Sequence, residues 1–530
     1  MKPISNVLIV GGGTAGWLTA AFLARTLGTA SATSANRVRI TLVESQEIGI
    51  IGVGEGTFPS IRGTLSAIGI DEARFVRECN ATFKQGIKFV DWVRPQGAPG
   101  IDHYFHPFSM PSQRQGGPEL LPYWLQGAAG AGVPFAEAAT MQKHVADALR
   151  GPKRMDDGDF LGPMNYAYHF DAARFATMLG EHARSLGVEH ILATVERVEL
   201  DDDGAIASVI TNERGALTAD LYIDCTGFRS ALIGDALGAP FHKVDDALFV
   251  DRALAVQVHY PQPDSPIPSY TISTAKEAGW IWDIGLQQRR GVGYVYSSRH
   301  TDDSRAEQVL RDYVGITTGP TKEDISPRML KLNVGYREVH WIKNCVAVGL
   351  SGGFLEPLEA SGIGLIETAA YLVSFLFPHN GDTEPVARIF NDLMRQRYER
   401  VVDFIKMHYC LTQRSDSQFW IDNADTRSIP ASLRDKLAMW RCRPPHRLDF
   451  ITDLEMYPPS SWQYVLYGME FQTAINANPV SYPRFEEARK EFAMIAQVAQ
   501  RAVTDLPSHR ALVEHLCKRH HLAGSKLESA

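Results

Sequence analysis

The sequence contains few cysteines, and they form no recognisable cluster. Its six cysteines are scattered from Cys79 to Cys517, with no Cys-x-x-Cys pair and no cysteine and histidine spacing typical of zinc. The sequence therefore predicts neither a disulfide framework nor a metal site. The pattern is typical of reduced, mostly buried thiols in a cytoplasmic protein.

Long apolar runs and an excess of basic residues are also absent. No apolar run reaches the roughly 18 residues that a membrane helix requires. The apolar segments near the N-terminus are split by glycines and preceded by a single basic residue, Lys2, which argues against a signal peptide. The formal net charge of -8 argues against nucleic acid or an anionic membrane as a partner. We therefore expect a cytoplasmic enzyme, monomeric or homodimeric.

The N-terminal segment does carry a recognisable pattern. Residues 6–28, NVLIVGGGTAGWLTAAFLARTLG, predict a buried strand, a glycine turn and a helix, and VRITLVES at 38–45 predicts a second strand. Gly11, Gly13 and Gly16 fit G-x-G-x-x-G, in which glycines allow backbone to approach a pyrophosphate at the helix N-terminus. Glu44 ends the second strand, where a carboxylate would bind ribose hydroxyls. The alternative is a glycine-rich surface turn.

NAD and FAD proteins share this motif, so the rest of the chain must separate them. Two later strands end in glycine, LYIDCTG at 221–227 and NCVAVGLSGG at 344–353. We expect both to return to the nucleotide domain, a layout typical of large flavoproteins with inserted segments. The prediction is an α/β fold with an FAD-binding, Rossmann-like domain of the glutathione-reductase type. That core would span 1–370, with a mixed sheet among insertions at about 58–190 and 230–340, and a mainly helical region would span 371–530.

One predicted strand contains two tryptophans. In GWIWDIGL, residues 279–286, Trp280 and Trp282 lie two residues apart, so both face the same side of a strand. RRGVGYVYSS at 289–298 is predicted to pair with this strand in a second sheet. Core or cross-strand packing is the usual role of such a pair.

Five motifs in order along the chain carry a specific resemblance. The sequence resembles the flavin-dependent halogenases of the tryptophan halogenase family through GGGTAGW (11–17), GVGEGT (52–57), TFKQGIKFVDW (82–92), WIWDI (280–284) and PLEASGIG (357–364). The family marker is W-x-W-x-I-P, and this chain has Gly285 in place of the proline. A second departure is Ala360, where the family motif has serine.

The resemblance implies a two-component reaction. A separate NADH-dependent flavin reductase would supply FADH2, which reacts with O2 to give a flavin hydroperoxide. Chloride or bromide would attack it, and the hypohalous acid would travel through a closed tunnel to a lysine. Lys84 matches that lysine, although periodicity alone does not separate it from Lys88. The tryptophan pair would keep organic substrate away from the flavin.

The resemblance also implies roles for residues near the C-terminal motif. Glu359 matches a glutamate that would stabilise the cationic ring and accept its proton. Glu356, three residues earlier, is a competitor for this role, but we expect it to have a capping or structural role. Backbone amides of Ser361 and Gly362 would hold the halide. The expected FAD contacts are Gly11, Gly13, Thr14, Ala15, Gly16, Glu44, Gly54, Val195, Leu350 and Ile363.

The family resemblance also implies that the substrate is a small aromatic molecule. His106, Phe108 and Trp462 are expected to line its pocket. The Tyr-Tyr pair of tryptophan-specific members is absent from the comparable segment, SSWQYVLYGMEF at 460–471. This departure favours indole or another neutral, electron-rich aromatic over free tryptophan.

Three other functions fit part of the pattern. A flavin-dependent aromatic monooxygenase would share the FAD motif, but it would not need the tryptophan pair together with Lys84 and Glu359. An NAD-linked dehydrogenase would need hydride-transfer residues that are not evident. A non-catalytic FAD-fold protein would not need an intact glycine motif.

Overall fold

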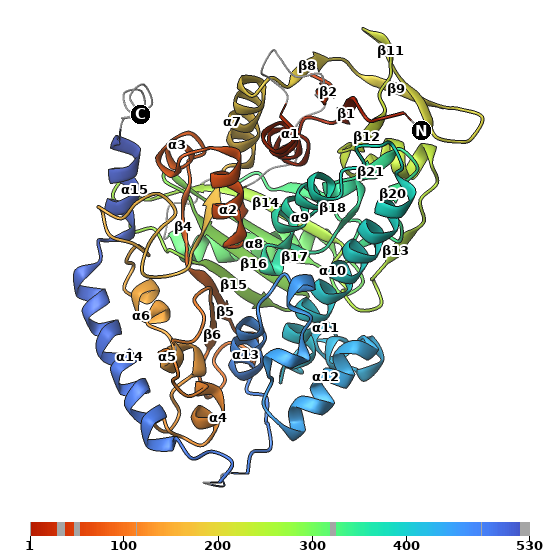
Figure 1. Ribbon diagram of the computed structural model, residues 1–530. Coiled ribbons are helices and arrows are strands. Elements are labelled where there is room, and N and C mark those ends of the chain that lie inside the picture. Colours follow the sequence, from red (N-terminus) through yellow and green to blue (C-terminus); the bar gives the residue numbers. More distant parts are fainter. Residues whose placement is uncertain are drawn as a thin grey trace.

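The computed structural model describes residues 2–28, 38–46, 54–112, 114–318, 325–476, 478 and 480–519 (Figure 1). A six-stranded sheet forms the nucleotide-type domain, in the order β20-β21-β12-β1-β2-β8. Its strands are β1 (Asn6–Val10), β2 (Arg39–Glu44), β8 (Glu189–Leu192), β12 (Leu221–Asp224), β20 (Trp341–Ile342) and β21 (Cys345–Ala347).

The connections within this sheet confirm the interrupted layout. β1 pairs in parallel with β2 and with β12, and β12 pairs in parallel with β21. Two segments that lie far downstream therefore return beside the first strand, as their glycine endings predicted. Helix α1 (Thr14–Leu27) follows the glycine turn and packs against α7 (Ala172–Ser185) and α9 (Ser361–Phe375).

A seven-stranded mixed sheet crosses the middle of the molecule (Figure 1), in the order β18-β14-β17-β16-β15-β5-β6. β16 contains the two tryptophans and pairs antiparallel with β17, which confirms the predicted hairpin. The strands are β5 (Gly86–Val90), β6 (His103–Pro107), β14 (Arg252–His259), β15 (Thr271–Lys276), β16 (Gly279–Gly285), β17 (Arg289–Tyr296) and β18 (Arg328–Lys331).

Three further sheets have three strands each. One is an antiparallel sheet of β9 (Val195–Leu200), β10 (Ile206–Thr211) and β11 (Gly215–Leu217). The second contains β13 (Phe241–Lys243), β19 (Gly335–Arg337) and β22 (Gly353–Phe354). The third contains β3 (Glu55–Gly56), β4 (Thr82–Lys84) and β7 (Ala167–Phe170).

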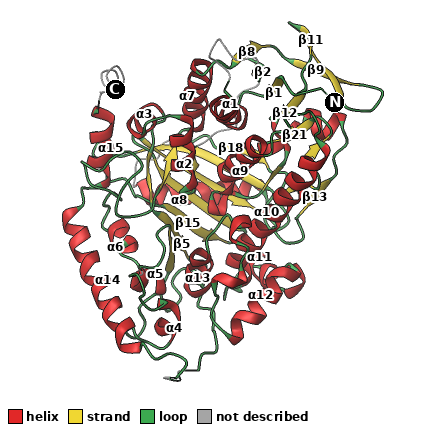
Figure 2. Cartoon of the chain, viewed as in Figure 1, coloured by secondary structure: helices red, strands yellow, loops and turns green. Residues whose placement is uncertain are grey.

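The C-terminal part is mainly helical, as expected (Figure 2). Its helices are α10 (Glu384–Cys410), α11 (Gln418–Ala424), α12 (Ala431–Cys442), α13 (Pro459–Gly468), α14 (Phe485–Asp505) and α15 (His509–Lys518). Pro507 separates the last two, because proline cannot continue a helix. α14 packs along the short helices α4 (Leu120–Leu125), α5 (Phe135–Ala139) and α6 (Gln142–Asp147), and α15 packs on β4 and α3 (Glu72–Glu78).

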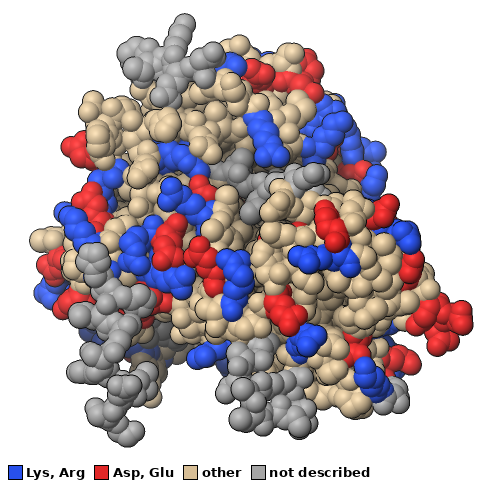
Figure 3. Space-filling view, turned by 90° about the horizontal axis from the view of Figure 1, so that it is seen from above, with Lys and Arg blue, Asp and Glu red and all other residues tan. Residues whose placement is uncertain are grey.

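The predicted division of the chain at residue 370 falls inside α9 and stays a prediction. One buried apolar cluster runs through the nucleotide sheet, the large sheet and the C-terminal helices. Two further helices, α2 (Ser60–Ile68) and α8 (Asp303–Thr318), complete the α-helices of the described residues, which also contain short 3-10 segments and one π-helical segment, Ala231–Ala236. Across the ranges that the structure covers, none of the helices combines the length and apolar character needed to cross a membrane. On the face in Figure 3, acidic and basic side chains are interspersed.

Candidate functional site

The glycine turn after β1 has the geometry of a phosphate cradle. Gly11 has φ of +111°, and a Cβ there would lie 2.2 Å from the Cys225 carbonyl oxygen. A Cβ on Gly16 would lie 1.8 Å from the Gly11 carbonyl oxygen. A Cβ on Gly13, by contrast, would meet no atom within 4 Å. The turn is thus tightly packed against the protein at Gly11 and Gly16, whereas the space beside Gly13 at the start of α1 is open. An open space there fits the pyrophosphate of a dinucleotide.

Glu44 ends β2 beside this turn. Its carboxylate lies 2.8 Å from His190 Nε2, and its side chain is 24% exposed. A Cβ on Gly12 would overlap this carboxylate, since it would lie 1.6 Å from Oε2. Glu44 therefore borders the glycine turn with one face open to solvent, a position from which it could reach a ribose.

The other expected FAD contacts come from several elements. Residue Gly349, just before Leu350, is packed so closely on α1 that an added Cβ would lie 2.7 Å from Ala15 Cβ. Ile363 is buried in the first turn of α9, which contacts α1. Gly54 has φ of +108° and faces Ile284 of β16. Thr14 opens α1 and Val195 opens β9. Gly52 and Val53 of the GVGEGT motif lie outside the described residues.

Lys84 is a fully buried lysine at the end of β4. Its Nζ lies 5.3 Å from the centre of the Phe108 ring. A Cβ on Gly56 would lie 3.1 Å from the same Nζ. Burial lowers the pKa of Lys84 to about 7, although the negative charge of Glu359 opposes that shift. A substantial fraction of Lys84 is therefore neutral near pH 7.

The structure separates Lys84 from Lys88. The two belong to different sheets, because the chain passes from β4 to β5 at Gln85. Lys88 is 24% exposed and lies 3.7 Å from Asp147. Sequence periodicity assumed one continuous element, so it could not reveal this break.

Glu359 is a buried carboxylate with two histidine partners. His106 Nδ1 lies 3.0 and 2.9 Å from its two oxygens, and His408 Nε2 lies 3.1 Å from Oε1. Burial opposes ionisation of Glu359, but His106 and His408 together lower its pKa to about 2. The carboxylate is therefore charged throughout the neutral range.

Each histidine has a further partner that fixes its orientation. The Tyr104 hydroxyl lies 2.6 Å from His408 Nδ1, and Ser461 Oγ lies 2.8 Å from His106 Nε2. If the Ser461 hydroxyl donates, His106 keeps an N–H directed at Glu359. His408 Nε2 lies beside the carboxylate at ion-pair distance, without the alignment of a hydrogen bond. Sequence reasoning missed Tyr104, His408 and Ser461. His408 lies within a long helix, and no local pattern in the sequence distinguishes it.

Glu356, three residues before Glu359, is also buried and partnered. Its Oε2 accepts a hydrogen bond from Trp280 Nε1 at 2.9 Å and another from the Tyr409 hydroxyl at 2.7 Å. Burial raises the pKa of Glu356 to about 7. The two tryptophans lie on the same face of β16, with ring centroids 6.4 Å apart.

The halide candidates Ser361 and Gly362 are the first two residues of α9. The N–H groups of a first helical turn have no acceptor within the helix, and they carry the positive end of its dipole. Ala360 precedes them in the left-handed conformation, with φ of +56°. The sharp turn between Glu359 and α9 thus leaves these amides available to an anion.

The expected substrate residues lie in one aromatic cluster. Phe108 packs edge-on against Phe58 and His106, with centroids 5.0 and 6.0 Å apart. Phe404 lies between His106 and Trp462, with centroids 5.8 and 4.9 Å away. Trp462 is completely buried, and its Nε1 has no hydrogen-bond partner.

The residues after Trp462 bond to protein backbone. Gln463 Nε2 donates to the Pro445 carbonyl at 3.1 Å, and the Tyr464 hydroxyl donates to the Ser109 carbonyl at 3.1 Å. These two polar groups therefore have partners within the fold.

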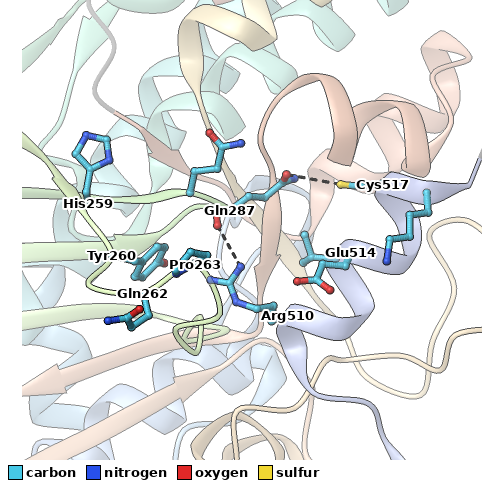
Figure 4. A pocket seen from close by; sticks show the side chains of 11 residues that line it. His259, Tyr260, Gln262, Pro263, Gln287, Arg510, Glu514 and Cys517 are labelled. Carbon is cyan, nitrogen blue, oxygen red and sulfur yellow. Dashed lines mark hydrogen bonds between the residues drawn. The ribbon is translucent and has the colours of Figure 1, made fainter.

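A separate cleft of about 500 Å³ lies between α15, the β16–β17 turn and the segment after β14. Arg510 Nη1 donates to the Gln287 carbonyl at 3.3 Å, and Cys517 Sγ lies 3.6 Å from Gln287 Oε1 (Figure 4). None of its lining residues is among the candidates above. Nowhere in the described part of the chain do three or more histidine, cysteine or acidic side chains group in a way that could hold a metal.

Comparison with known proteins agrees with this geometry. The tryptophan halogenase family model matches residues 6–480. The chain is 36% identical over 526 residues to tryptophan 6-halogenase SttH of Streptomyces toxytricini, covering 95% of this chain and 96% of SttH. It is 34% identical to tryptophan 7-halogenase RebH of Lentzea aerocolonigenes, covering 83% and 82%.

Solved structures agree as well. A tryptophan halogenase from Shewanella frigidimarina NCIMB 400 superposes with a TM-score of 0.92 at 41% identity, covering 97% of this chain and 98% of that one. BrvH, a flavin-dependent halogenase from Brevundimonas sp. BAL3, superposes with a TM-score of 0.85 at 34% identity, covering 97% and 99%. The expected FAD-binding Rossmann-like fold is thereby confirmed. The chain belongs to the tryptophan halogenase family: it is a flavin-dependent halogenase, an oxidoreductase that works with a separate flavin reductase.

Proposed function

We propose that this enzyme halogenates indole or a similar neutral, electron-rich aromatic, using bromide or chloride, with Lys84 and Glu359 as its catalytic residues. The observation that carries the proposal is the burial of a lysine with a lowered pKa and of an ionised glutamate that interact electrostatically. Perturbed ionisable groups brought together in this way are typical of catalytic sites.

The open glycine turn, Glu44 and the start of α1 would hold FAD, and Leu350 and Ile363 would contact its ring system. Bound in reduced form, FAD would use O2 to oxidise halide to hypohalous acid. The first amides of α9, at Ser361 and Gly362, would hold the halide before this step. The tryptophan pair, buried Trp280 and half-buried Trp282, would exclude the organic substrate from the flavin.

Lys84 would receive the halogenating species. As an ammonium, it can donate a hydrogen bond to hypohalous acid and position its halogen. As a neutral amine, it can itself be halogenated. A pKa of about 7 makes both forms available near neutral pH. The aromatic ring of Phe108 beside Nζ excludes water from this step.

Glu359 would act on the substrate ring. Electrophilic attack makes the ring cationic, and a carboxylate that stays ionised stabilises this charge through a low-dielectric environment. A group with a pKa of about 2 is a weak base, but the cationic ring is a strong acid. Glu359 can therefore accept its proton as aromaticity is restored.

The preference for a neutral aromatic rests on the segment around Trp462. The curated relatives SttH and RebH are named as tryptophan halogenases. In this chain the side chains of Gln463 and Tyr464 donate hydrogen bonds to backbone carbonyls. Neither side chain would then bind the ammonium or the carboxylate of an amino acid. A site without these partners would accept indole without leaving the partners of an ammonium or a carboxylate unpaired.

Mass spectrometry tests the proposal. The protein is incubated with FAD, a generic flavin reductase, NADH and O2, with indole or tryptophan, in chloride or bromide. A halogen isotope pattern on indole that disappears in Lys84→Ala supports it, and the two salts rank the halides. Halogenation of tryptophan but not indole would contradict the substrate class. A product 16 mass units heavier, independent of halide, would instead indicate a monooxygenase.

A further inference from the structure

The two motif tryptophans share a face of β16 but contact different partners. Trp282 packs across the sheet, where a Cβ on Gly293 would lie 2.1 Å from its ring. Trp280 is 1% exposed and directs its indole N–H at Glu356. Shared bulk therefore does not account for Trp280, because its polar edge has a specific buried acceptor.

Glu356 lies at the start of a very short segment that carries the proposed chemistry. It is the residue before the single 3-10 turn Pro357–Glu359. The chain then passes through Ala360, with φ of +56°, into α9. Glu356 thus precedes Glu359 by one turn, and four residues separate it from Ser361.

Three elements hold this segment through its two carboxylates. Adjacent residues of α10 reach both of them, since His408 Nε2 lies 3.1 Å from Glu359 Oε1 and the Tyr409 hydroxyl donates to Glu356. β6 contributes His106 to Glu359, and β16 contributes Trp280 to Glu356. The left-handed residue within the segment is unfavourable for alanine, so surrounding contacts must maintain it.

We propose that Trp280 is a positioning residue, which acts through Glu356 to fix the turn that carries Glu359 and the halide-binding amides. This inference rests on the proposed function for the roles of Glu359, Ser361 and Gly362. The anchor itself consists only of the buried hydrogen bonds among Trp280, Tyr409 and Glu356. Bulk near the flavin is then a second consequence of Trp280, and the main role of Trp282.

Hydrogen exchange followed by mass spectrometry tests the anchor independently of activity. Trp280→Phe keeps an aromatic ring but removes the N–H donor, and Trp282→Phe is its matched control on the same face. We expect the backbone amides of residues 356–364 to exchange about tenfold faster in Trp280→Phe, because one buried hydrogen bond to the turn is lost. Exchange in Trp282→Phe should match the wild type.

Two substitutions of the acceptor complete the test and do not alter the tryptophan. The amide oxygen in Glu356→Gln can accept both donors, so exchange should stay as in the wild type. Glu356→Leu accepts neither, so exchange should rise as in Trp280→Phe. Tyr409→Phe should shift exchange in the same direction. If Trp280→Phe leaves exchange unchanged, or if Trp282→Phe raises it equally, the inference is overturned.

Activity then links the anchor to the reaction. With indole and bromide, Trp280→Phe should raise the bromide KM and lower kcat about tenfold, and Glu356→Gln should retain both values. If the Trp280→Phe enzyme oxygenates indole while its amide hydrogen exchange is unchanged, Trp280 would serve only to keep the substrate away from the flavin. This result would overturn the inference. Failure of the wild type to halogenate would refute the proposed function, and the exchange data would still decide the anchor.

Discussion

Lys84 and Phe108 meet inside the protein, with the lysine Nζ 5.3 Å from the centre of the aromatic ring. Both side chains are buried, and Gly56 lies so close that a Cβ there would be 3.1 Å from the lysine Nζ. An ammonium group in such surroundings loses most of its hydration, which lowers its pKa to about 7. The arrangement suits a reaction that needs a neutral amine, and it should reduce the stability of the fold.

Replacing Lys84 should therefore stabilise the protein in a pH-dependent way. The unfolded chain holds a proton on Lys84 up to about pH 10.5, whereas the folded chain releases it near pH 7. The charged lysine destabilises the fold below pH 7, and this penalty vanishes as pH rises toward 10.5. In urea unfolding, Lys84→Met should exceed the wild type by roughly 1–3 kcal/mol at pH 6. The difference should shrink at pH 9.5.

Lys88→Met is the control for this measurement. Lys88 is partly exposed and pairs with Asp147, so its replacement should change stability by less than about 1 kcal/mol at either pH. A Lys84→Met protein no more stable than the wild type at pH 6 would mean that Lys84 stays protonated with a compensating partner. Indole halogenation should be lost in Lys84→Met and retained in Lys88→Met.

The order of the elements could be predicted from the sequence, because strands and glycine turns leave local patterns. The βαβ opening, the strands that return at 221 and 345 and the Trp280 hairpin were all evident. The candidate Lys84 came from a family motif, since periodicity treated residues 82–92 as one element. Only the three-dimensional structure shows the chain leaving one sheet for another at Gln85.

The partners of Glu359 could not be predicted for a different reason. His106 and His408 lie about 300 residues apart in sequence, and neither stands in a local motif that relates them. Their meeting depends on α13, against which both α10 and β6 pack, and this is a property of the tertiary fold. A histidine in a long helix is ordinarily a core or surface residue, so nothing in the sequence singled out His408.

Removal of His408 should change how activity depends on pH. His106 and His408 lower the pKa of Glu359, against the effect of burial. In His408→Phe the pKa of Glu359 should rise, so activity should fall at a higher pH on the acidic side than in the wild type. We expect kcat to decrease about tenfold at neutral pH, with little change in the KM for indole.

Tyr104→Phe is the matched variant, because it removes only the hydroxyl that bonds to His408. It should shift the acidic limb of the kcat profile in the same direction by a smaller amount. A His408→Phe profile that parallels the wild type, at any overall rate, would show that His408 supports the fold and does not position Glu359.

Replacement by alanine should have contrasting effects at two positions of the glycine turn, Gly13 and Gly16. Gly13→Ala adds a methyl group to open space at the start of α1, so the fold should tolerate it. That space is where the pyrophosphate would lie, so FAD affinity should fall at least about tenfold. Gly16→Ala places a Cβ 1.8 Å from the Gly11 carbonyl oxygen and should destabilise the apoprotein by roughly 2 kcal/mol or more.

Thermal unfolding and FAD titration by fluorescence separate these two effects. Gly13→Ala should keep the wild-type Tm without FAD and lose the stabilisation that FAD gives. Unchanged FAD binding in a folded Gly13→Ala protein would contradict a dinucleotide site at this turn.

Gly285 stands where the family motif has proline, and introducing proline at this position should destabilise the protein. A Cβ at Gly285 would lie 2.8 Å from Ile267 Cγ2 and 2.8 Å from the Tyr260 hydroxyl. Thr82 Oγ1 also donates to the Gly285 carbonyl at 2.5 Å, which restrains the backbone. Gly285→Pro should therefore cost roughly 2–3 kcal/mol of stability, because a whole ring would enter a packed space.

Gly63→Ala is the control: Gly63 lies in α2, and a Cβ there would meet no atom within 4 Å. It should be neutral or stabilising by about 0.5–1 kcal/mol, since alanine favours a helix. Equal Tm values for Gly285→Pro and the wild type would mean that Ile267 and Tyr260 move aside, and that glycine here reflects no packing constraint.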